Sequence, residues 1–402
     1  MQKIDKFITS AAGILLLLFP LCLIAGRAPA DVALSLIGLL FLIHTVLMRD
    51  YDWFKPLWVR ALLLLWGWMI LRVLFAEDPE FGIGRALSFI RYGAFAVALG
   101  WWLLPRNPEL MKRLMMVIVA AGLFLAVDGL IQFVSGFDLF GKPKFSDTRL
   151  TGPYNSPTLG NMIYPLAALS AVFLLSQMNR QKAVWHNALY VIAAGGMFIG
   201  VFISGERSPT LLLLFALGII FILTHNDMRK KMIMLAVAGL VGAGAMMLYK
   251  PALVERQIGD TIGKTTAFKE SGYGKVFADG LKMIEQNFMI GVGVKHYRLE
   301  CAKPKFKSEQ CLTHPHNSYL EIFAENGVIG FILFLGFIGF LLRDIFKNHA
   351  LWRADVIKLG AVGLICAELW PIIGTSSFFA SWGVMGLWLA IGIASATDRS
   401  RG

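Results

Sequence analysis

The sequence has few charged residues and lacks the patterns on which several protein classes depend. Only 16% of its 402 residues are Asp, Glu, Lys or Arg, whereas soluble domains average about a quarter. No internal repeat or low-complexity tract is present. The net charge is +12, but no motif of interleaved basic and aromatic residues for RNA accompanies it. These absences exclude an ordinary soluble domain and argue against nucleic-acid binding.

Metal-binding and thiol-based sites also lack their usual patterns. The four cysteines show no zinc spacing. Cys22 and Cys366 lie in apolar stretches, where cysteine behaves as a small apolar residue. The loops that we expect outside the membrane contain no Asp-x-Asp pair. We therefore predict neither a bound metal nor a cofactor.

The chain instead contains long apolar blocks. Hydrophobic residues make up 57% of it and the mean hydropathy is +0.64. Apolar blocks of about 18–25 residues alternate with short charged clusters, which is typical of transmembrane helices. We predict an all-α polytopic membrane protein with about twelve spans, at residues 7–25, 31–48, 57–76, 83–104, 111–135, 158–177, 185–204, 208–224, 231–249, 319–342, 355–373 and 378–396. Ala28-Pro29-Ala30 resembles a signal-peptidase site, but we interpret the long apolar run before it as a retained helix.

Basic residues gather in alternate loops, which indicates the orientation. One set of loops holds Arg49 and Lys55, Arg106 to Arg113, Arg180 and Lys182, Arg229 to Lys231, and Arg343 to Lys358. The positive-inside rule places this set and both termini in the cytoplasm. The short loops at 26–30, 76–80, 204–206 and 374–377 then lie outside, as do two long segments. The predicted organisation is residues 1–249 with nine spans and an external loop at 136–157, residues 250–318 as a large external loop, and residues 319–402 with three spans and a cytoplasmic tail.

The large external loop contains two local features. Phe277, Leu281, Ile284 and Phe288 share one face of a predicted amphipathic helix. That helix either lies on the membrane surface or packs on the spans as a cap. Cys301 and Cys311 flank a basic stretch, and in an oxidising compartment we expect a disulfide between them.

Ionisable residues inside predicted spans lie on one side of the membrane. Such residues are costly in lipid and are functional by default, although structural ion pairs are the alternative. All of them fall in the outer half of their spans: Arg72, Arg85, Arg91, Asp128, Arg207 and Glu368. A proton or ion pathway would also need charges in the inner half. We therefore expect binding or chemistry at the outer leaflet.

Arg207 follows a short turn, Ser204-Gly205-Glu206, and precedes Pro209. Proline suits the first turn of a helix, so Arg207 should lie beside free helical N–H groups. A guanidinium next to a helix N-terminus favours a phosphate or pyrophosphate. A topological anchor is the alternative role.

A second polar junction precedes the tenth predicted span. Ser318 and Glu321 have the spacing of a capping box, which predicts a helix that begins near Tyr319. His316 and Asn317 would then lie just before the helix. A histidine in that position is well placed to exchange a proton with a group arriving from the polar side.

These motifs resemble those of a known family. His316-Asn317, followed by Gly327 and Gly330, resembles the signature of O-antigen ligases and Wzy-type O-antigen polymerases. The turn that carries Arg207 is similar to the family's arginine turn. The other matching pieces are Arg149 to Pro157, similar to a shorter external loop, and Ser271 to Lys275 followed by Gly291-Val292-Gly293, where Lys275 stands in the place of a second arginine.

The resemblance implies a glycosyltransferase of the GT-C class in the bacterial inner membrane. Such an O-antigen ligase transfers a glycan from undecaprenyl diphosphate to a sugar hydroxyl of lipid A-core at the periplasmic face, in lipopolysaccharide biosynthesis. The implied mechanism is inverting and independent of metal. His316 would be the catalytic base, with His314 and His296 as competitors.

Cations would stabilise the leaving diphosphate in such a mechanism. Arg207 fits this role together with Lys275 or Arg256, and Arg298 is a further candidate. The substrate-binding residues that we predict in addition are His314, Asn317, Tyr319 and Arg91. Glu321 could orient the histidine, although capping fits it better.

Two other functions compete with the ligase. A polymerase would extend the glycan on its lipid carrier; the basic composition and the single large loop after the ninth span favour the ligase. A polysaccharide transporter or flippase is disfavoured because the buried charges are one-sided and no paired, broken, repeat-related spans are present.

Overall fold

The computed structural model describes residues 2–105, 107–179, 181, 183–306, 308, 310–347, 355–372, 377–379 and 382–396. Several residues used to predict the orientation lie outside these ranges. They are Arg106, Arg180, Lys182, Arg353, the turn at residues 374–376 and the tail from residue 397.

The described chain is built of helices, with only isolated bridges between residues 137 and 149. Its α-helices are α1 (Gln2–Ala25), α2 (Arg27–Met48), α3 (Leu57–Leu74), α4 (Pro79–Ser88), α5 (Ile90–Val97), α6 (Pro108–Ser135), α7 (Leu159–Ser176), α8 (Val184–Ile203), α9 (Arg207–Leu223), α10 (Asn226–Tyr249), α11 (Pro251–Val254), α12 (Asp260–Thr266), α13 (Gly272–Gln286), α14 (Tyr297–Cys301), α15 (Ser318–Lys347), α17 (Val356–Glu368) and α18 (Met385–Ser395). Short π-helical turns occupy Ala98–Leu103 and Glu255–Gly259. The all-α prediction is confirmed.

Eight helical stretches in the described chain are long and apolar enough to cross a membrane: α1, α2, α3, the continuous stretch Pro79–Leu103 that contains α4 and α5, α6, α7, α8 and α15. Helices α9 and α18 are shorter apolar helices. The chain is therefore a multi-pass helical membrane protein. Each of the twelve predicted spans overlaps a helix, but α17 and α18 cover only 13 and 11 residues. The number of crossings stays a prediction.

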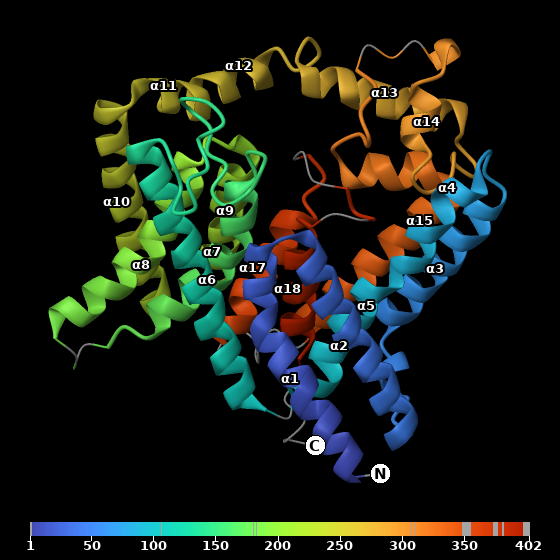
Figure 1. Ribbon diagram of the computed structural model, residues 1–402, viewed down its shortest axis with the longest axis horizontal. Helices are drawn as coiled ribbons and strands as arrows, with labels where there is room; N and C mark the ends of the chain where they lie inside the picture. The colour runs from blue at the N-terminus through green and yellow to red at the C-terminus, as the bar shows by residue number, and fades with distance from the viewer. Residues whose placement is uncertain are drawn as a thin grey trace.

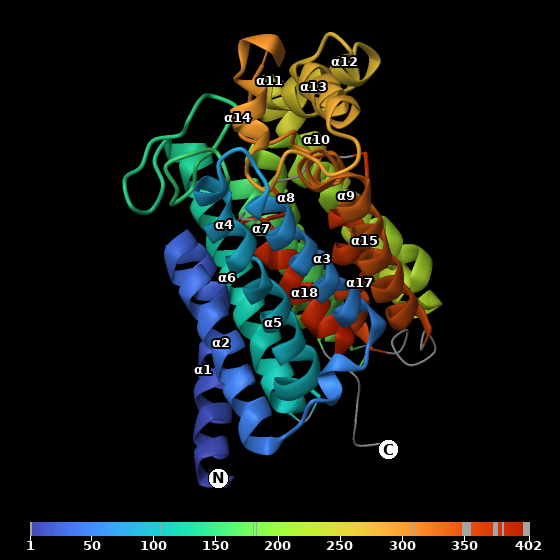
Figure 2. The same cartoon turned by 90° about the vertical axis from the view of Figure 1, so that its right-hand side faces the viewer.

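The helices surround a central group formed by α7, α17 and α18 (Figure 1). Helix α7 is buried along almost its whole length, and α17 packs against α7, α9 and α18. The 136–157 loop and α11 to α14 lie at one end of the bundle, which we call the loop face (Figures 1 and 2). The first turn of α1 lies at the opposite end.

The predicted amphipathic helix exists, and its buried face agrees with the prediction in part. Helix α13 ends at Gln286, and it buries Val276, Gly280, Met283 and Ile284 against α15 and α14. Of the predicted face, Ile284 is buried and Phe277 is partly buried, whereas Leu281 and Phe288 are exposed. Absence of a side chain at Gly280 lets α13 approach Pro315 and Leu320 closely, which a period-based prediction that counts only large apolar residues misses. In this structure α13 packs as a cap on the spans.

Several charges predicted inside spans have structural partners. Arg72 donates hydrogen bonds to the carbonyl oxygens of Ile290 and Gly291 at 2.7–3.0 Å. Asp128 accepts one from Leu139 N at 2.9 Å and so holds the 136–157 loop.

Arg91 is also held by protein groups, and its role in substrate binding stays a prediction. Its nitrogen atoms bond Ser88 O, Asp31 Oδ1 and Tyr92 Oη at 2.9–3.1 Å. This pattern ties α5 to α2. Glu368 is the last residue of α17.

Candidate functional site

The turn before α9 is held in shape by the 136–157 loop. Gly205 has φ 73°, and a Cβ there would lie 1.7 Å from Thr148 O, so only glycine fits. Leu150 N donates to Ser204 O at 3.0 Å. The two segments that the sequence marked separately therefore form one unit that presents Arg207.

Three arginines gather around this turn. Arg256 Nε donates to Gly205 O at 2.8 Å. Arg207 Nη1 lies 3.6 Å from Asp260 Oδ2, which is an ion pair but too long for a good hydrogen bond. Arg149 lies close enough to Arg256 for their charges to repel. We call Arg149, Arg207 and Arg256 the arginine cluster.

The arginine cluster has a positive charge that nearby acids offset only in part. Arg149 Nε and Arg207 Nη1 are buried and have no hydrogen-bond partner among the described residues. Burial, and then repulsion by Arg149 and Arg207, lowers the pKa of Arg256. Burial, and then Arg207, likewise lowers the pKa of Lys264 on α12. Such a site is complementary to a diphosphate.

Glu206 is the acid closest to the arginine cluster along the chain, and it is buried. Its carboxylate accepts hydrogen bonds from Asn161 N at 3.2 Å and Asn161 Nδ2 at 2.7 Å. Burial raises the pKa of Glu206 to about 7, although Asn161 and Arg149 act in the opposite direction. Below that pH the carboxyl is neutral, so the cluster then keeps its full positive charge.

The histidine segment lies where α13 meets the start of α15. The ring of His316 lies 4.3 Å from that of His314 and 6.4 Å from that of Tyr273 on α13, between ring centroids. His316 has φ 52°, a left-handed conformation that is uncommon for a residue with a side chain. Such backbone conformations cluster at functional sites.

The predicted capping box at Ser318 is wrong, although the predicted start of α15 was within one residue. Asn317 is the cap, because its Oδ1 accepts from Tyr319 N at 3.0 Å and Leu320 N at 3.1 Å. Glu321 does not reach back to Ser318. Its carboxylate accepts from Ser377 Oγ at 2.6 Å and Phe378 N at 2.8 Å.

Asn317 and Tyr319 also tie the histidine segment to the chain after α17. Asn317 Nδ2 donates to Pro371 O at 2.7 Å, and Tyr319 Oη donates to Leu369 O at 2.6 Å. These hydrogen bonds give both residues a structural role, and their contacts with substrate stay a prediction. Both residues restrain the chain directly after His316.

Gly291 and Gly327, which belong to two different motifs, lie where the main chains of their segments pack closely together. Helix α15 is broken at Gly327, which has φ 64°, and the segment around Gly291 crosses it there. A Cβ on either glycine would lie 2.4–2.5 Å from main-chain atoms of the other segment. Val292 N and Gly293 N donate to Ala324 O and Glu325 O at 2.9 and 2.7 Å. The break leaves a short helical stretch that carries Glu321 and Glu325 beside His316.

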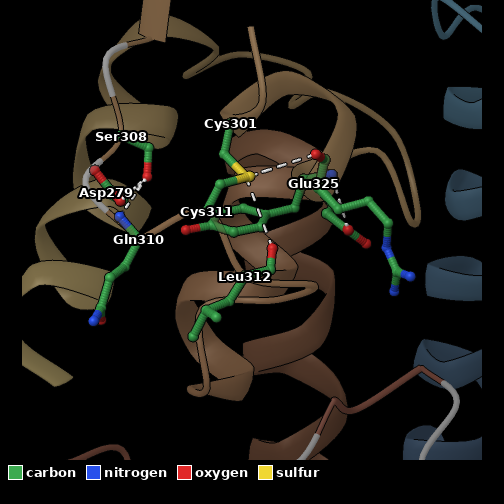
Figure 3. Close-up of a disulfide and its surroundings, with 9 residues drawn as sticks. Asp279, Cys301, Ser308, Gln310, Cys311, Leu312 and Glu325 are labelled. Carbon is green, nitrogen blue, oxygen red and sulfur yellow. Dashed lines mark hydrogen bonds between the residues drawn. A yellow bond between two sulfur atoms is a disulfide. The ribbon is translucent and has the colours of Figure 1, made fainter. Parts of the chain in front are cut away.

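Cys301 and Cys311 form a disulfide, with their Cα atoms 5.4 Å apart (Figure 3). The bond joins the end of α14 to the chain three residues before His314. Ser308 donates to Asp279 of α13 nearby (Figure 3). The disulfide thus restrains the approach to the histidine segment.

Helices α11 to α13 run across the loop face (Figure 1). They connect the arginine cluster to the segment that carries His316. Asp260 and Lys264 of α12 lie beside Arg207, and Tyr273 at the start of α13 lies against His316. Lys275 lies on the exposed side of α13.

The structure thus brings Arg256 to Arg207, and it separates the remaining candidates. His296 is buried, with its ring nitrogens 2.9 Å from Val294 O and 2.7 Å from Asp78 O, so it is a structural residue. Arg298 lies near Arg85 and is not part of the arginine cluster. Arg149 was not predicted as a site residue; its only signal was its place at the start of the Arg149 to Pro157 loop motif.

Comparison with known proteins supports the same assignment. No curated protein matches the chain. Residues 192–335, which include the arginine turn, α11 to α14 and the histidine segment, match the family described as O-antigen ligase (Wzy_C). The resemblance that the motifs indicated is therefore confirmed over residues 192–335, which match the Wzy_C O-antigen ligase family.

Proposed function

We propose that this protein is an O-antigen ligase that transfers a glycan from undecaprenyl diphosphate to a sugar hydroxyl of lipid A-core. The observation that carries the proposal is the arginine cluster around Gly205, whose nitrogen atoms remain partly without acceptors on the face that also presents His316. The family match supports a role in lipopolysaccharide biosynthesis. In our proposal the loop face is periplasmic, the protein lies in the bacterial inner membrane, and the fold belongs to the GT-C class with twelve spans.

In the proposed reaction His316 accepts the proton of the acceptor hydroxyl. The hydroxyl oxygen forms a bond to the anomeric carbon, and the bond from that carbon to the diphosphate oxygen breaks. The electron pair leaves with the diphosphate, and attack from the opposite face inverts the anomeric configuration. A base with a pKa near neutrality is suited to this step, and histidine is the usual choice.

The arginine cluster stabilises the diphosphate as negative charge develops on it. Arg207 and Arg256 supply fixed donors, and Arg149 adds a third charge. Charge stabilisation of this kind is worth about 10²–10³ in rate for a single donor. In this proposal no metal is needed, because the cations of the chain do this work.

The proposal is tested by reconstitution of the purified protein with a lipid-diphosphate glycan and two acceptors in separate reactions. Lipid A-core should gain the glycan. If a second lipid-linked glycan gains it instead, the protein is a polymerase. His316→Ala and Arg207→Ala should each lower the rate by about 10²-fold or more while protein level and membrane insertion persist. Wild-type rates in either variant would remove that residue from the mechanism.

A further inference from the structure

A second group of cations lies on the loop face, at the opposite side from the arginine cluster. Arg85 is on α4, Arg298 is on α14, and Lys295 lies just before α14. The three are close enough for their charges to repel one another. We call them the second cationic group.

Helix α4 and the chain before α14 are packed together at this point, so the proximity is part of the fold. Lys295 Nζ lies 3.8 Å from the centre of the Phe81 ring and donates to Phe81 O at 2.8 Å. Gly82 approaches Val294 O so closely that a Cβ would lie 2.6 Å from it. Because Phe81 and Arg85 are four residues apart, they share one face of α4.

Among the residues that the structure describes, no group accepts a hydrogen bond from the side chains of the two arginines of this group. Both side chains are half-buried. Arg298 Nε is buried without a hydrogen-bond partner. Within the residues that the structure describes, the guanidinium of Arg85 forms no hydrogen bond or ion pair; only longer-range charges act on it. Two adjacent half-buried cations without acceptors are unfavourable unless an anion occupies the space between them.

The acids nearby are already bonded to other groups. Glu325 accepts hydrogen bonds from Lys295 N at 2.8 Å and Tyr297 N at 3.3 Å. Glu321 is bonded to Ser377 and Phe378, and Asp78 caps α4 through Phe81 N at 3.1 Å. The negative charges of Glu321 and Glu325 partly offset the positive charge of Arg85. Within the described chain, however, none of these acids accepts a hydrogen bond from the guanidinium groups of Arg85 and Arg298.

The position of the second cationic group relative to His316 indicates what the anion belongs to. The charges of Arg85 and His316 both act on Glu321, so both residues lie around the first turns of α15. Arg149 belongs to the 136–157 loop, Arg207 to α9 and Arg256 to the turn before α12. The second cationic group instead comes from α4, α14 and the chain just before α14. The reaction needs two substrates to meet at His316, and the arginine cluster accounts for one of them.

We propose that Arg85 and Arg298, with Lys295, bind a phosphate group of the acceptor glycolipid and thereby place its hydroxyl at His316. The inference rests on the proposed function for the identity of the acceptor. Paired arginine forks are suited to phosphate because each offers two parallel N–H donors. These residues position the acceptor and do not take part in the bond changes.

The test compares acceptors with and without phosphate. We expect Arg85→Gln and Arg298→Gln to raise KM for phosphorylated lipid A-core about tenfold or more. KM for the lipid-linked donor should not change. With enzymatically dephosphorylated lipid A-core, wild type and both variants should have the same KM. Equal losses on both acceptors would show a structural role and overturn the proposal.

Two controls make the result specific. Arg343→Gln removes an exposed arginine at the other end of α15, where it bonds Asp344, and should change neither KM. Arg85→Lys keeps the charge but loses the fork, so it should fall between wild type and Arg85→Gln. It also keeps the test valid if the glutamine variant does not fold.

A binding assay without donor separates this inference from the proposed function. Wild-type protein in nanodiscs should bind labelled phosphorylated lipid A-core, and Arg298→Gln should weaken binding about tenfold. Binding without transfer would contradict the proposed function and leave this site in place. If the variants weaken binding to phosphatidylglycerol nanodiscs and not to the glycolipid, the ligand is a membrane headgroup and the acceptor assignment fails.

Discussion

At the scale of single residues, the arginine cluster is defined by contacts that sequence spacing does not reveal. Arg256 lies 49 positions after Arg207 and reaches the same turn through Gly205 O, at 2.8 Å. The sequence motifs placed Lys275 at the position of the second cation and left Arg256 and Arg298 as alternatives. The π-helical turn at Glu255–Gly259, which aims Arg256, has no sequence signal that we recognise.

The first prediction separates these two cations. Arg256→Ala should lower the transfer rate by about 10²-fold, because it removes a donor from the cluster. Lys275→Ala, a substitution on the exposed side of α13, should lower it less than threefold. The measurement is initial transfer rate at saturating acceptor, with protein level checked by immunoblot. A larger loss for Lys275→Ala would return the role to that residue.

The second prediction concerns pH. The pKa of Glu206 is raised from 4.5 to about 7 by burial. As pH rises through 7 the carboxyl ionises and offsets the charge of Arg149 and Arg256. Affinity for inorganic pyrophosphate should therefore fall severalfold between about pH 6 and pH 8 in wild type, relative to Glu206→Gln. The ratio of the two proteins at each pH removes the titration of the ligand itself.

The same shift affects stability with a defined sign. Because the folded pKa of Glu206 lies above its unfolded value, the folded protein binds more protons between pH 4.5 and about 7. The stability of wild type should fall over this range as pH rises, and Glu206→Gln should lack that component. Identical pH profiles for the two proteins, in both affinity and thermal unfolding, would contradict the assignment.

At the scale of elements, the broken helix α15 organises the site. The sequence predicted where this helix starts, because a polar residue precedes an apolar run. It did not predict that Asn317 would replace Ser318 as the cap, because both residue types cap helices equally well. The break at Gly327 depends on a segment some 35 residues earlier in the chain, and periodicity within one helix contains no information about such a crossing.

The third prediction tests the crossing. Gly327→Ala places a Cβ 2.4 Å from Met289 O at a residue with φ 64°. It should destabilise the protein by about 2 kcal/mol or more and lower transfer. Gly336→Ala is a matched control in the same helix, because nothing lies within 4 Å of its Cβ. The readout is the midpoint of thermal unfolding in detergent; equal midpoints for the two variants would show that the crossing is not tight.

At the scale of the whole molecule, hydropathy predicted the helices well, because lipid forces every backbone group in a span to bond within its own helix. The ends of α6 to α9 lie within about three residues of the predicted spans. The functions of buried charges were harder to predict. Arg72, Arg91 and Asp128 have the same signal as Arg207. Only the tertiary contacts show that these three form hydrogen bonds with protein groups, whereas Arg207 has an ion pair with Asp260 at 3.6 Å.

The fourth prediction concerns orientation. Single cysteines placed at Thr313 on the loop face and at Lys55 between α2 and α3 should differ in labelling of intact spheroplasts, in a protein whose own four cysteines are changed to serine. A membrane-impermeant maleimide should label position 313 and should reach position 55 only after permeabilisation. Protection of position 313 would place His316 in the cytoplasm and would refute the proposed function.

The hydrogen bonds of Glu321 have a consequence for how the protein is made. Its carboxylate is held by Ser377 and Phe378, and its neighbour Glu325 by Lys295 N and Tyr297 N. The groups that complete this part of α15 therefore come from both earlier and later stretches of the chain. During synthesis His316, the proposed catalytic base, would reach its final position only after residue 378 has left the ribosome. A nascent chain that ends after α15 should thus be inserted but inactive, so the enzyme acquires activity at the last stage of its assembly.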